Sequence, residues 1–513
     1  MEQPLQFHLP SRAPIESLSD AAHDMERTPG AYDLPGGFGE SVRRSFRAVI
    51  AELSEAEFAA PFVAADPRQP FAPYWRRIFA LLAERGMIAP PGVHFEQMFN
   101  DEPKIWALRA LSPFPAGQSD GVRVIEQYCR GISLDLNVAI SKVVGELLER
   151  YPLLIYRQKD LYRVSPAQLR RDGRRFLDPA LAAGFAAWQK DVYPIRRYSD
   201  DSMFYWVEGH ELAHGGEALI PAQFVFWNYG VDRELNEPHL REANTNGAAG
   251  NFTRTEAILS GIYELIQRDA FLARWLYRKQ PRRIDPQGTS NPELRELLAQ
   301  CERYKFDVVF LYTTIDLEVP SCVAFLLDKG KAASRVAMAL GGGCGPDIEE
   351  AMVRALTEAL GVHHWLRRRE RFTLDEQHVP FRDNRIGQAE RLLLWSDEKM
   401  LPLLERFLDG QLISLDEVRR SYPKLSSPEE ELKHVLGVLR RKGSGYEVYV
   451  YDASHDLLSA LGYYSVKVVI PALVPLYLGE VNACLDGPRF RELAEKMGWD
   501  DSAFPNPIPH PFP

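Results

Sequence analysis

The last nine residues of the chain constrain its fold most, because every second one of them is a proline. The segment reads Pro505-Asn-Pro-Ile-Pro-His-Pro-Phe-Pro513. Proline fixes φ at about −65° and has no N–H group, so the segment is held in the extended polyproline II form and cannot join a helix or a sheet interior. A disordered tail or a ligand for a peptide-binding domain fits this pattern. The apolar character of the segment supports a second interpretation, in which it threads into the protein and brings the terminal carboxylate of Pro513 to a site.

Composition and charge narrow the class of protein. A chain of 513 residues, of which 45% are hydrophobic and 26% charged, has the composition of a globular protein of about three domains. The net charge of −10 argues against nonspecific binding to nucleic acid or acidic membranes. Neither a membrane-spanning run nor a secretory signal pattern is present, so we expect a cytoplasmic protein. The five cysteines form no C-x-x-C pair, and we expect them to be reduced and mostly buried.

The order of helix and strand patterns predicts an α+β fold with an N-terminal accessory domain. Residues 1–115 are rich in proline and glycine and carry amphipathic helix patterns, so we expect a largely helical domain of unknown role there. From about residue 116 to 513, long helices alternate with short β-branched and aromatic runs. The runs expected to be strands are 222–227, 306–312, 321–327, 446–451 and 466–470.

Three expected helices carry acidic groups at helical spacing. The groups are Glu146 and Glu149 on the first helix, Glu256, Glu264, Gln267 and Arg268 on the second, and Glu350, Arg354 and Glu358 on the third. A solvated face with ordinary salt bridges explains any one of these helices. Three such faces together indicate a cleft in which hard cations separate facing carboxylates. Mg²⁺ takes a few carboxylates plus phosphate oxygens, so a nucleotide triphosphate could be held there.

Glycine-rich segments precede two of these helices. They span residues 244–251 and 341–345. Such segments can turn backbone N–H groups toward a phosphate, and they are equally often plain turns. Neither segment matches a P-loop or a dinucleotide-binding G-x-G-x-x-G motif.

The sequence also contains the zinc peptidase pattern H-E-x-x-H. It begins at His210-Glu211 and ends at His214. Glycines before and after the pattern, together with the aromatic residues at 204–206, predict a strand rather than the long helix that the motif requires. The metzincin continuation is absent as well. These features make a peptidase the weaker interpretation.

Taken in order, the motifs of the chain resemble those of the YcaO superfamily. They are G-E-x-x-E-R at 145–150, N-G-A-A-G at 246–250, E-A followed by E-L-I-x-R-D-A at 256–270, E-A followed by R-A-L-T-E-A at 350–359, V-I-P-x-L-x-P-L at 469–476 and P-x-P-x-P at 509–513. The ending is most similar to that of azoline-forming cyclodehydratases. The resemblance covers about residues 116–513.

This resemblance implies a YcaO-type fold, with mixed sheets and long helices around a cleft for ATP and Mg²⁺. It implies an ATP-dependent cyclodehydratase that acts on a ribosomally made precursor peptide, as in the biosynthesis of bacteriocins and related natural products. A Cys, Ser or Thr side chain of the peptide would attack the preceding carbonyl, and ATP would phosphorylate the resulting oxygen, so that a thiazoline or oxazoline forms. A YcaO enzyme that forms a thioamide or an amidine is a second interpretation. A noncatalytic YcaO scaffold in a peptide-modifying complex is a third.

The resemblance also assigns roles to residues by position. The expected nucleotide contacts are Lys142, Glu146, Glu149, Asn246, Glu256, Glu264, Gln267, Arg268, Arg354 and Glu358, and the expected Mg²⁺ ligands among them are Glu146, Glu149, Glu264 and Gln267. The carboxylate of Pro513 is the expected catalytic group, which would position the substrate or move protons. Lys142 stands near a usual serine position and Gln267 replaces a usual glutamate, which leaves a partner-dependent or regulatory protein open.

The expected partners follow from what the N-terminal region lacks. Single-chain cyclodehydratases carry an E1-like domain with a zinc-binding cysteine set, which residues 1–115 do not contain. The resemblance therefore implies a separate E1-like or leader-binding partner protein that presents the precursor peptide. A flavin-dependent azoline dehydrogenase is a further candidate partner, and a homodimer stays open. Nucleic acid and membranes are not expected as partners.

Overall fold

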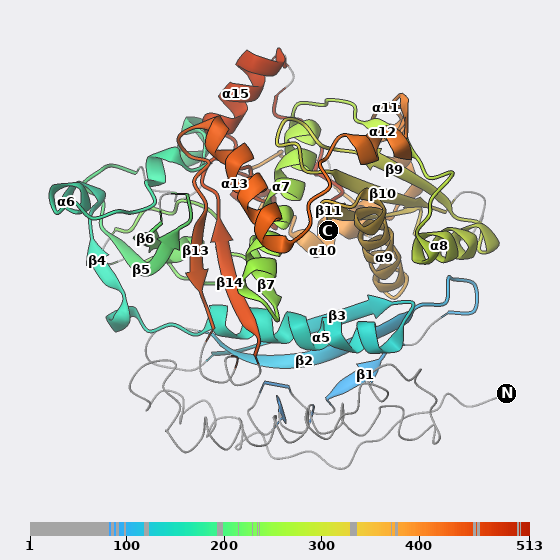
Figure 1. The fold of residues 1–513 in the computed structure, drawn as a ribbon, viewed down its shortest axis with the longest axis horizontal. Coiled ribbons are helices and arrows are strands. Elements are labelled where there is room, and N and C mark those ends of the chain that lie inside the picture. Colours follow the sequence, from blue (N-terminus) through green and yellow to red (C-terminus); the bar gives the residue numbers. More distant parts are fainter. Residues whose placement is uncertain are drawn as a thin grey trace.

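Three sheets and the helices between them make up the described part of the chain (Figure 1). The structure is a computed structural model, and it describes residues 79, 82–83, 87–88 and 92–513, apart from gaps at 97–98, 117–122, 192–197, 214, 228, 233, 235, 329–335, 371, 375–377, 455–457, 459–461, 500–501 and 503. The expected α+β class with mixed sheets and long helices is confirmed. Most of residues 1–91 lie outside the described range, so the accessory domain stays a prediction.

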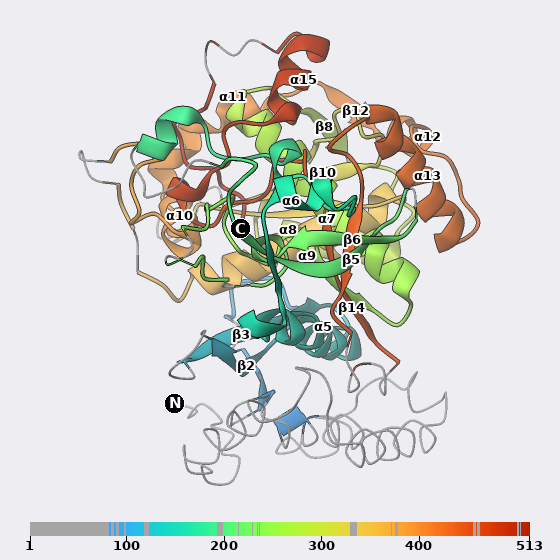
Figure 2. The ribbon, with the colours of Figure 1, turned by 90° about the vertical axis from the view of Figure 1, so that its left-hand side faces the viewer.

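The first sheet forms a layer at one side of the molecule, as both ribbon views show (Figures 1 and 2). It is antiparallel in the order β1 (Val93–Phe95), β2 (Trp106–Ala116) and β3 (Arg123–Ser133). Helix α5 (Leu136–Arg150) follows and packs on β3 and β2. Its N-terminus is capped by Asp135, whose carboxylate accepts from the Val138 N–H at 3.0 Å. This sheet spans the expected domain boundary between residues 115 and 116.

The second sheet has six antiparallel strands. Its order is β4 (Tyr162–Val164), β5 (Phe204–Glu211), β13 (Tyr449–Asp452), β14 (Tyr464–Val469) and β7 (Ala248–Asn251), with β6 (Glu217–Pro221) paired to β5. The strands expected within 446–451 and 466–470 are present as parts of β13 and β14. The strand expected at 222–227 is wrong, because Ala222–Phe224 form a 3-10 helix. Every residue from 222 to 227 is buried, and a continuous apolar run suits a buried turn as well as a strand.

The third sheet has five strands. Its order is β11 (Met338–Cys344), β10 (Ser321–Leu327), β9 (Asp307–Tyr312), β8 (Arg282–Asp285) and β12 (Leu412–Ser414), and only β8 and β12 run parallel. Helix α9 (Ile348–Leu366) packs on β11 and β10. Helix α7 (Arg254–Leu276) crosses the centre of the molecule, in contact with β14 and β7 on the one hand and with β11 and β10 on the other. The remaining helices are α6 (Pro166–Arg171), α8 (Pro292–Arg303), α10 (Gln388–Trp395), α11 (Glu405–Leu408), α12 (Leu415–Arg420), α13 (Pro428–Lys442) and α15 (Pro488–Met497), and the short 3-10 helices are η1 (Tyr151–Leu154), η2 (Gln158–Asp160), η3 (Pro179–Leu181), η4 (Ala187–Asp191), η5 (Ala222–Phe224), η6 (Glu398–Leu403) and η7 (Glu480–Asn482).

The glycines at 341–345 have a packing role. Most of this segment is strand, because β11 extends to Cys344. The expectation of a phosphate-binding or plain turn before the helix is therefore wrong for most of it. A Cβ at Gly341 would collide with the carbonyl oxygen of Ala355, and one at Gly343 with that of Ala351. The glycines therefore let α9 lie directly against the strand.

The proline-rich tail threads into the protein, as the second interpretation of its sequence expects. Both ribbon views place the C-terminus inside the molecule (Figures 1 and 2). Polyproline II backbone makes no internal hydrogen bonds, so its buried carbonyls need other donors. The indole N–H of Trp275 donates to Ile508 O at 2.9 Å, and that of Trp395 donates to Pro509 O at 2.9 Å. The ring of Phe512 is fully buried.

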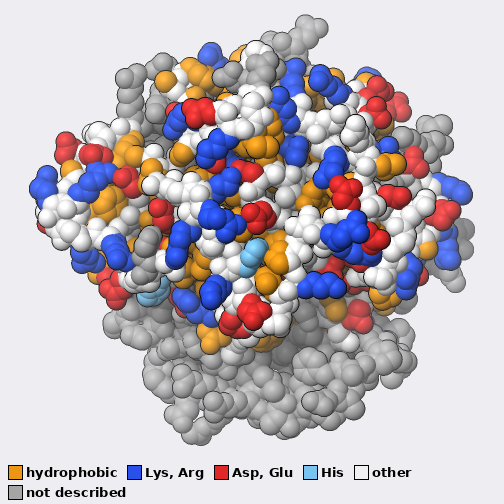
Figure 3. All heavy atoms as spheres, turned by 45° about the horizontal axis from the view of Figure 1, so that its top comes forward, with side chains coloured by type: hydrophobic (Ala, Val, Ile, Leu, Met, Phe, Trp, Pro, Cys, Tyr) orange, Lys and Arg blue, Asp and Glu red, His pale blue; other side chains and the backbone are white. Residues whose placement is uncertain are grey.

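The cysteines, the apolar character of the helices and the surface charges bear on the expectations drawn from composition. All five cysteines are free and buried, which confirms the reduced, interior state expected for them. In the described part of the chain, no helix has the length and apolar character needed to cross a bilayer. On the face shown in Figure 3, acidic and basic side chains are interspersed.

We predict that Gly343→Ala lowers the free energy of unfolding by about 1–3 kcal/mol, because the new methyl group overpacks the contact between β11 and α9. Gly230→Ala is the matched control, since a Cβ there meets no atom within 4 Å. Thermal unfolding of both variants measures the difference. Equal unfolding temperatures for the two variants would contradict the packing role of Gly343.

Candidate nucleotide and metal site

Helices α5 and α7 bring carboxylates together in the interior. Burial raises the pKa of Glu149 to about 8. The carboxylates of Glu264 and Glu146 add to this rise, although Arg150 opposes it. These effects require the three carboxylates to lie near one another, so Glu146, Glu149 and Glu264 share one region.

Neighbouring donors hold two of these carboxylates in place. One oxygen of Glu264 accepts from the Gly247 N–H at 2.8 Å, and the other accepts from Arg268 at 3.1 Å. Glu146 accepts from the backbone N–H of Arg130 at 2.5 Å and pairs with Arg150 at 2.6 Å. A carboxylate offers about four lone-pair positions, so both groups retain capacity for a cation.

Helix α9 adds Glu358 to the same cluster. Its carboxylate accepts from the Gly342 N–H at 2.6 Å. Burial raises the pKa of Glu358, Arg268 opposes the rise and Glu264 adds to it. The glycine-rich segment thus directs its N–H group to a carboxylate of the site.

Two cations of the predicted set lie near Glu358. The Lys142 ammonium donates to Ile132 O at 2.8 Å, and desolvation lowers its pKa while Glu358 counteracts this effect. The guanidinium of Arg354 donates to Cys344 O at 2.8 Å and also acts on the pKa of Lys142. The basic groups predicted to contact phosphate therefore border the acidic cluster.

The tail ends beside these residues. The guanidinium of Arg268 lies over the ring of Phe512, 4.5 Å from its centroid. Gln267 is 8% exposed, and a Cβ at Gly342 would collide with both the Gln267 side chain and the Phe512 ring. Pro513 is buried.

Two residues predicted to contact the nucleotide, Glu256 and Asn246, have other partners in the structure. Glu256 forms a capping arrangement at the start of α7, where Thr253 Oγ1 donates to its carboxylate at 2.6 Å. It stands about 12 Å along the helix from Glu264, given a rise of 1.5 Å per residue. Asn246 is buried and its amide donates to Leu476 O at 2.6 Å. The structure thus places the Asn246 amide on a backbone carbonyl and Glu256 apart from the other carboxylates, so their nucleotide contacts stay predictions.

Sequence reasoning missed two basic residues of this region. Lys467 of β14 is 1% exposed and donates to Asn244 O at 2.6 Å. Burial lowers its pKa to about 7, Arg241 lowers it further, and Glu264 and Glu149 raise it. A single lysine within the apolar run 466–470 was a usable sequence signal, whereas nothing in the local sequence marks Arg241.

The carboxylates of this region fit a divalent cation that takes its remaining ligands from the phosphates of a nucleotide. Within the described ranges, no three His, Cys, Asp or Glu side chains are grouped closely enough to enclose a metal ion by themselves. Burial and neighbouring carboxylates raise the pKa of Glu149 and of Glu358, and a bound cation would relieve the repulsion among these charges. Mg²⁺ commonly takes one or two carboxylates and completes its coordination with phosphate oxygens and water.

The zinc peptidase pattern forms no comparable site. His210 and Glu211 are successive residues of β5, so their side chains point to opposite faces of the sheet. His214 lies outside the described residues. The strand predicted from the aromatic residues at 204–206 is present as part of β5, which continues to Glu211.

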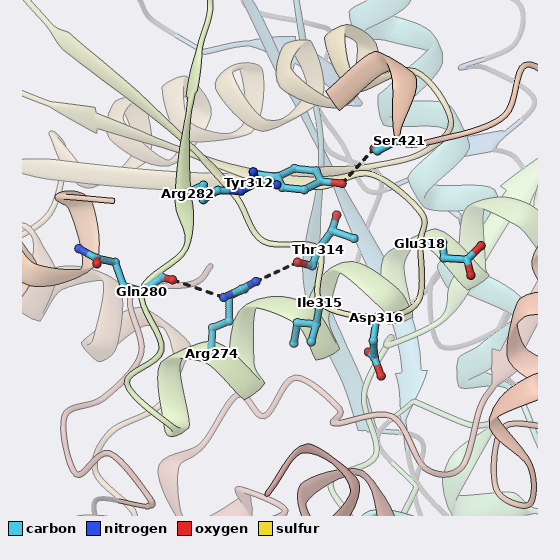
Figure 4. A pocket seen from close by; sticks show the side chains of 9 residues that line it. All are labelled: Arg274, Gln280, Arg282, Tyr312, Thr314, Ile315, Asp316, Glu318 and Ser421. Carbon is cyan, nitrogen blue, oxygen red and sulfur yellow. Dashed lines mark hydrogen bonds between the residues drawn. The ribbon is translucent and has the colours of Figure 1, made fainter. Parts of the chain in front are cut away.

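A separate cavity lies at the far end of α7 (Figure 4). Its volume is about 410 Å³, and its lining residues are Arg274, Gln280, Arg282, Tyr312, Thr314, Ile315, Asp316, Glu318 and Ser421. Arg274 donates to the backbone carbonyls of Thr313 and Thr314 at 2.8 Å each, and Asp316 pairs with Arg489 at 2.6 Å. None of the site residues predicted from the sequence lines this cavity.

Comparison with a protein family identifies the chain. The model of the YcaO family, described as an ATP- and Mg²⁺-binding cyclodehydratase family, matches residues 131–474. Because this match spans more than half of the sequence, the chain belongs to the YcaO family. The predicted family and the predicted cofactors, ATP and Mg²⁺, are confirmed.

Curated relatives match a smaller part of the chain. An uncharacterized protein in the region 3′ of tfuA in Rhizobium leguminosarum bv. trifolii is 30% identical over 162 residues, which are 30% of this chain and 37% of that protein. An uncharacterized protein of Methanothermobacter thermautotrophicus is 32% identical over 153 residues, which are 30% of this chain and 39% of that protein. The matches thus span less than half of either relative.

Solved structures share the fold. A heterocyclase in complex with substrate and cofactor superimposes with a TM-score of 0.65 at 22% identity, over 85% of this chain and 57% of the other. YcaO from Methanopyrus kandleri, bound with AMPPCP and Mg²⁺, gives 0.55 at 19% identity, over 81% and 94%. A chain of the E. coli microcin synthetase McbBCD complex gives 0.52 at 15% identity, over 79% and 95%.

We predict that Glu149→Gln stabilises the nucleotide-free protein increasingly as the pH rises from 5 to 8. The unfolded carboxyl loses its proton near its ordinary pKa of 4.5, whereas the folded one keeps it up to about 8. Glu149 therefore destabilises the folded chain across this interval, by an amount that becomes constant above it. The side chain is half-buried, so we expect a gain of about 1–3 kcal/mol.

Denaturant unfolding at several pH values measures this gain. Glu417→Gln is the control, because Glu417 is an exposed partner of Arg282. Mg²⁺ and ATP should protect the Glu149→Gln protein less than the wild type against unfolding. A pH-independent difference would show that Glu149 is not held among repelling carboxylates.

Proposed function

We propose that this chain is the ATP-dependent cyclodehydratase component that forms thiazolines or oxazolines from Cys, Ser or Thr of a ribosomally made precursor peptide. The observation that carries the proposal is the position of the tail, whose buried end lies against Arg268 and Gln267 at the acidic cluster. A buried terminal carboxylate beside a nucleotide site suits a reaction that needs a proton acceptor next to a phosphoryl donor.

The proposed reaction conserves atoms and charge in two stages. The substrate thiol or hydroxyl loses its proton as it adds to the preceding carbonyl carbon, and the resulting oxyanion takes the γ-phosphoryl group of ATP while ADP leaves. The C–O bond then breaks, phosphate leaves with that oxygen, and loss of the amide proton gives the C=N bond of the azoline. An amide oxygen is a poor leaving group, so its conversion to phosphate removes the main barrier.

The residues of this chain would share the tasks of that reaction. Glu146, Glu149 and Glu264 would hold Mg²⁺, with Gln267 as a neutral ligand, and Mg²⁺ would supply charge neutralisation at the phosphates. Arg268 and Arg354 would contact the phosphates, with Lys142 and Glu358 beside them. The carboxylate of Pro513 would orient the substrate or accept the amide proton.

Two other interpretations keep the same fold. A different nucleophile would give a thioamide or an amidine. A noncatalytic scaffold is supported by Gln267 and Lys142, because the first removes a negative charge from the proposed metal site and the second adds a positive one. The burial of the tail end favours azoline formation over both.

A partner protein completes the proposal. We propose that a separate E1-like or leader-binding protein presents the precursor peptide, and that a flavin-dependent dehydrogenase can follow to oxidise the azoline. The support is the resemblance in fold to a chain of the McbBCD complex, a microcin synthetase made of several proteins. The precursor peptide itself is the substrate in this arrangement.

The decisive measurement is the mass of a precursor peptide after incubation with this protein, its partner, ATP and Mg²⁺. We expect the loss of one water mass per ring, coupled to release of phosphate. Glu264→Gln and Arg354→Gln should each slow both by at least about 100-fold, because they remove charge at the transferring phosphoryl group. Glu417→Gln should leave both unchanged. Exchange of sulfur for oxygen would indicate a thioamide, and unchanged peptide without phosphate release would indicate a scaffold.

We predict that one glycine appended after Pro513 slows azoline formation by about 100-fold or more without changing ATP binding, because it displaces the carboxylate from the site. Pro507→Ala is the control, since Pro507 is exposed within the same tail. Single-turnover kinetics and nucleotide titration separate the two effects. Full activity of the extended protein would exclude a catalytic role for the carboxylate.

A further inference from the structure

Arg241 is a buried cation without a polar partner. Its side chain is 6% exposed, and its guanidinium lies 4.0 Å from the ring centroid of Phe224. Among the residues that the structure describes, it has no carboxylate or carbonyl within hydrogen-bond distance of the guanidinium. Burial of an unpaired charge costs several kcal/mol, by order of magnitude. A site of this kind calls for an anion.

The other buried arginines of the described part show the usual arrangement. Arg489 pairs with Asp269 at 2.9 Å and with Asp316 at 2.6 Å, and Arg391 lies 3.5 Å from Glu480. Both of these buried arginines thus have a carboxylate partner. Arg241 is the exception.

A second cation stands next to it. Arg241 lies close enough to Lys467 to lower the pKa of the Lys467 ammonium. Lys467 donates one of its three ammonium protons to Asn244 O at 2.6 Å, three residues along the chain from Arg241. Two like charges in the interior repel each other, so the pair adds to the need for an anion.

The position of the pair identifies the kind of anion. Lys467 is followed by Val468, whose N–H donates to Gly247 O at 2.7 Å, and the Gly247 N–H donates to Glu264 at 2.8 Å, so Lys467 lies close to the proposed Mg²⁺ and nucleotide site. Arg268 and Arg354 approach that site from α7 and α9, whereas Lys467 approaches from β14 and Arg241 from the segment before β7. The pair thus adds two basic groups beside the acidic cluster from elements other than these helices.

We propose that Arg241 and Lys467 form a phosphate site that receives the phosphoryl group after its transfer from ATP and holds it until inorganic phosphate leaves. This assignment rests on the proposed function. A guanidinium binds a phosphoryl group through two parallel hydrogen bonds, and an ammonium adds a point charge. Breakage of the substrate C–O bond leaves both electrons on the departing phosphate, and the two cations stabilise that charge.

The test measures phosphate binding without any peptide. The unfolding temperature is recorded against inorganic phosphate at constant ionic strength, with ADP and Mg²⁺ at saturating concentration. We expect phosphate to raise the unfolding temperature of the wild type. Arg241→Gln and Lys467→Met should each weaken phosphate binding by about 10–100-fold, as expected for lost charge-assisted hydrogen bonds.

Arg274→Gln is the matched control. Arg274 is also a desolvated arginine with a lowered pKa, but it donates to backbone carbonyls at the remote cavity of Figure 4. Its loss should lower the unfolding temperature without phosphate and preserve the shift that phosphate causes. Arg241→Gln should show the reverse pattern, with an equal or higher unfolding temperature without phosphate and a much smaller shift.

Three outcomes would overturn the proposal. They are a wild type that phosphate does not stabilise, an Arg241→Gln protein that retains the full shift, and a shift that depends on Arg268 alone. In a complete reaction, Arg241→Gln should also reduce product inhibition by phosphate. Because the binding test contains no peptide, failure to form azolines leaves its result valid and tells the two proposals apart.

Discussion

Repulsion among buried carboxylates is the constraint on which the centre of this protein depends. Glu149, Glu264 and Glu358 come from three helices, and their mutual influence shows that they share one region. Arg150 and Arg268 offset part of this charge. In the proposed function, bound Mg²⁺ offsets the remainder, so metal and nucleotide binding would stabilise the folded chain as well as permit catalysis. The pKa of Glu149 is raised first by burial and then by the neighbouring carboxylates of Glu264 and Glu146.

The tail joins the core of the protein to this site. Its backbone is held by the indole groups of Trp275 and Trp395, and its last aromatic ring packs 4.9 Å from Phe271. Trp275 and Phe271 belong to α7, the helix that also carries Glu264 and Arg268. Order in the tail and order in the site therefore depend on one helix. Proline suits this task because it loses little backbone entropy on burial.

The sequence predicts local features of this fold well and tertiary ones poorly. The helices of the site were predictable because i, i+3 and i, i+4 spacing is local, and the tail was predictable because proline fixes its backbone. The glycines at 341–345 were misread because α9, which lies against them, requires their small size. No role was predicted for Arg241, because its neighbours Phe224, Cys484 and Lys467 come from separate segments of the chain. A buried cation has no local sequence pattern.

The two departures from the family pattern, Gln267 and Lys142, change the charge of the proposed site in the same direction. Gln267 replaces a negative group, and Lys142 adds a positive one near Glu358. Both make the proposed site less negative, and the proposed phosphate site at Arg241 and Lys467 adds positive charge near it. A less negative site holds metal ions more weakly and phosphate more strongly. In the proposed function, direct contacts between cationic side chains and phosphate therefore carry more of the nucleotide binding than they would beside a fully acidic metal site.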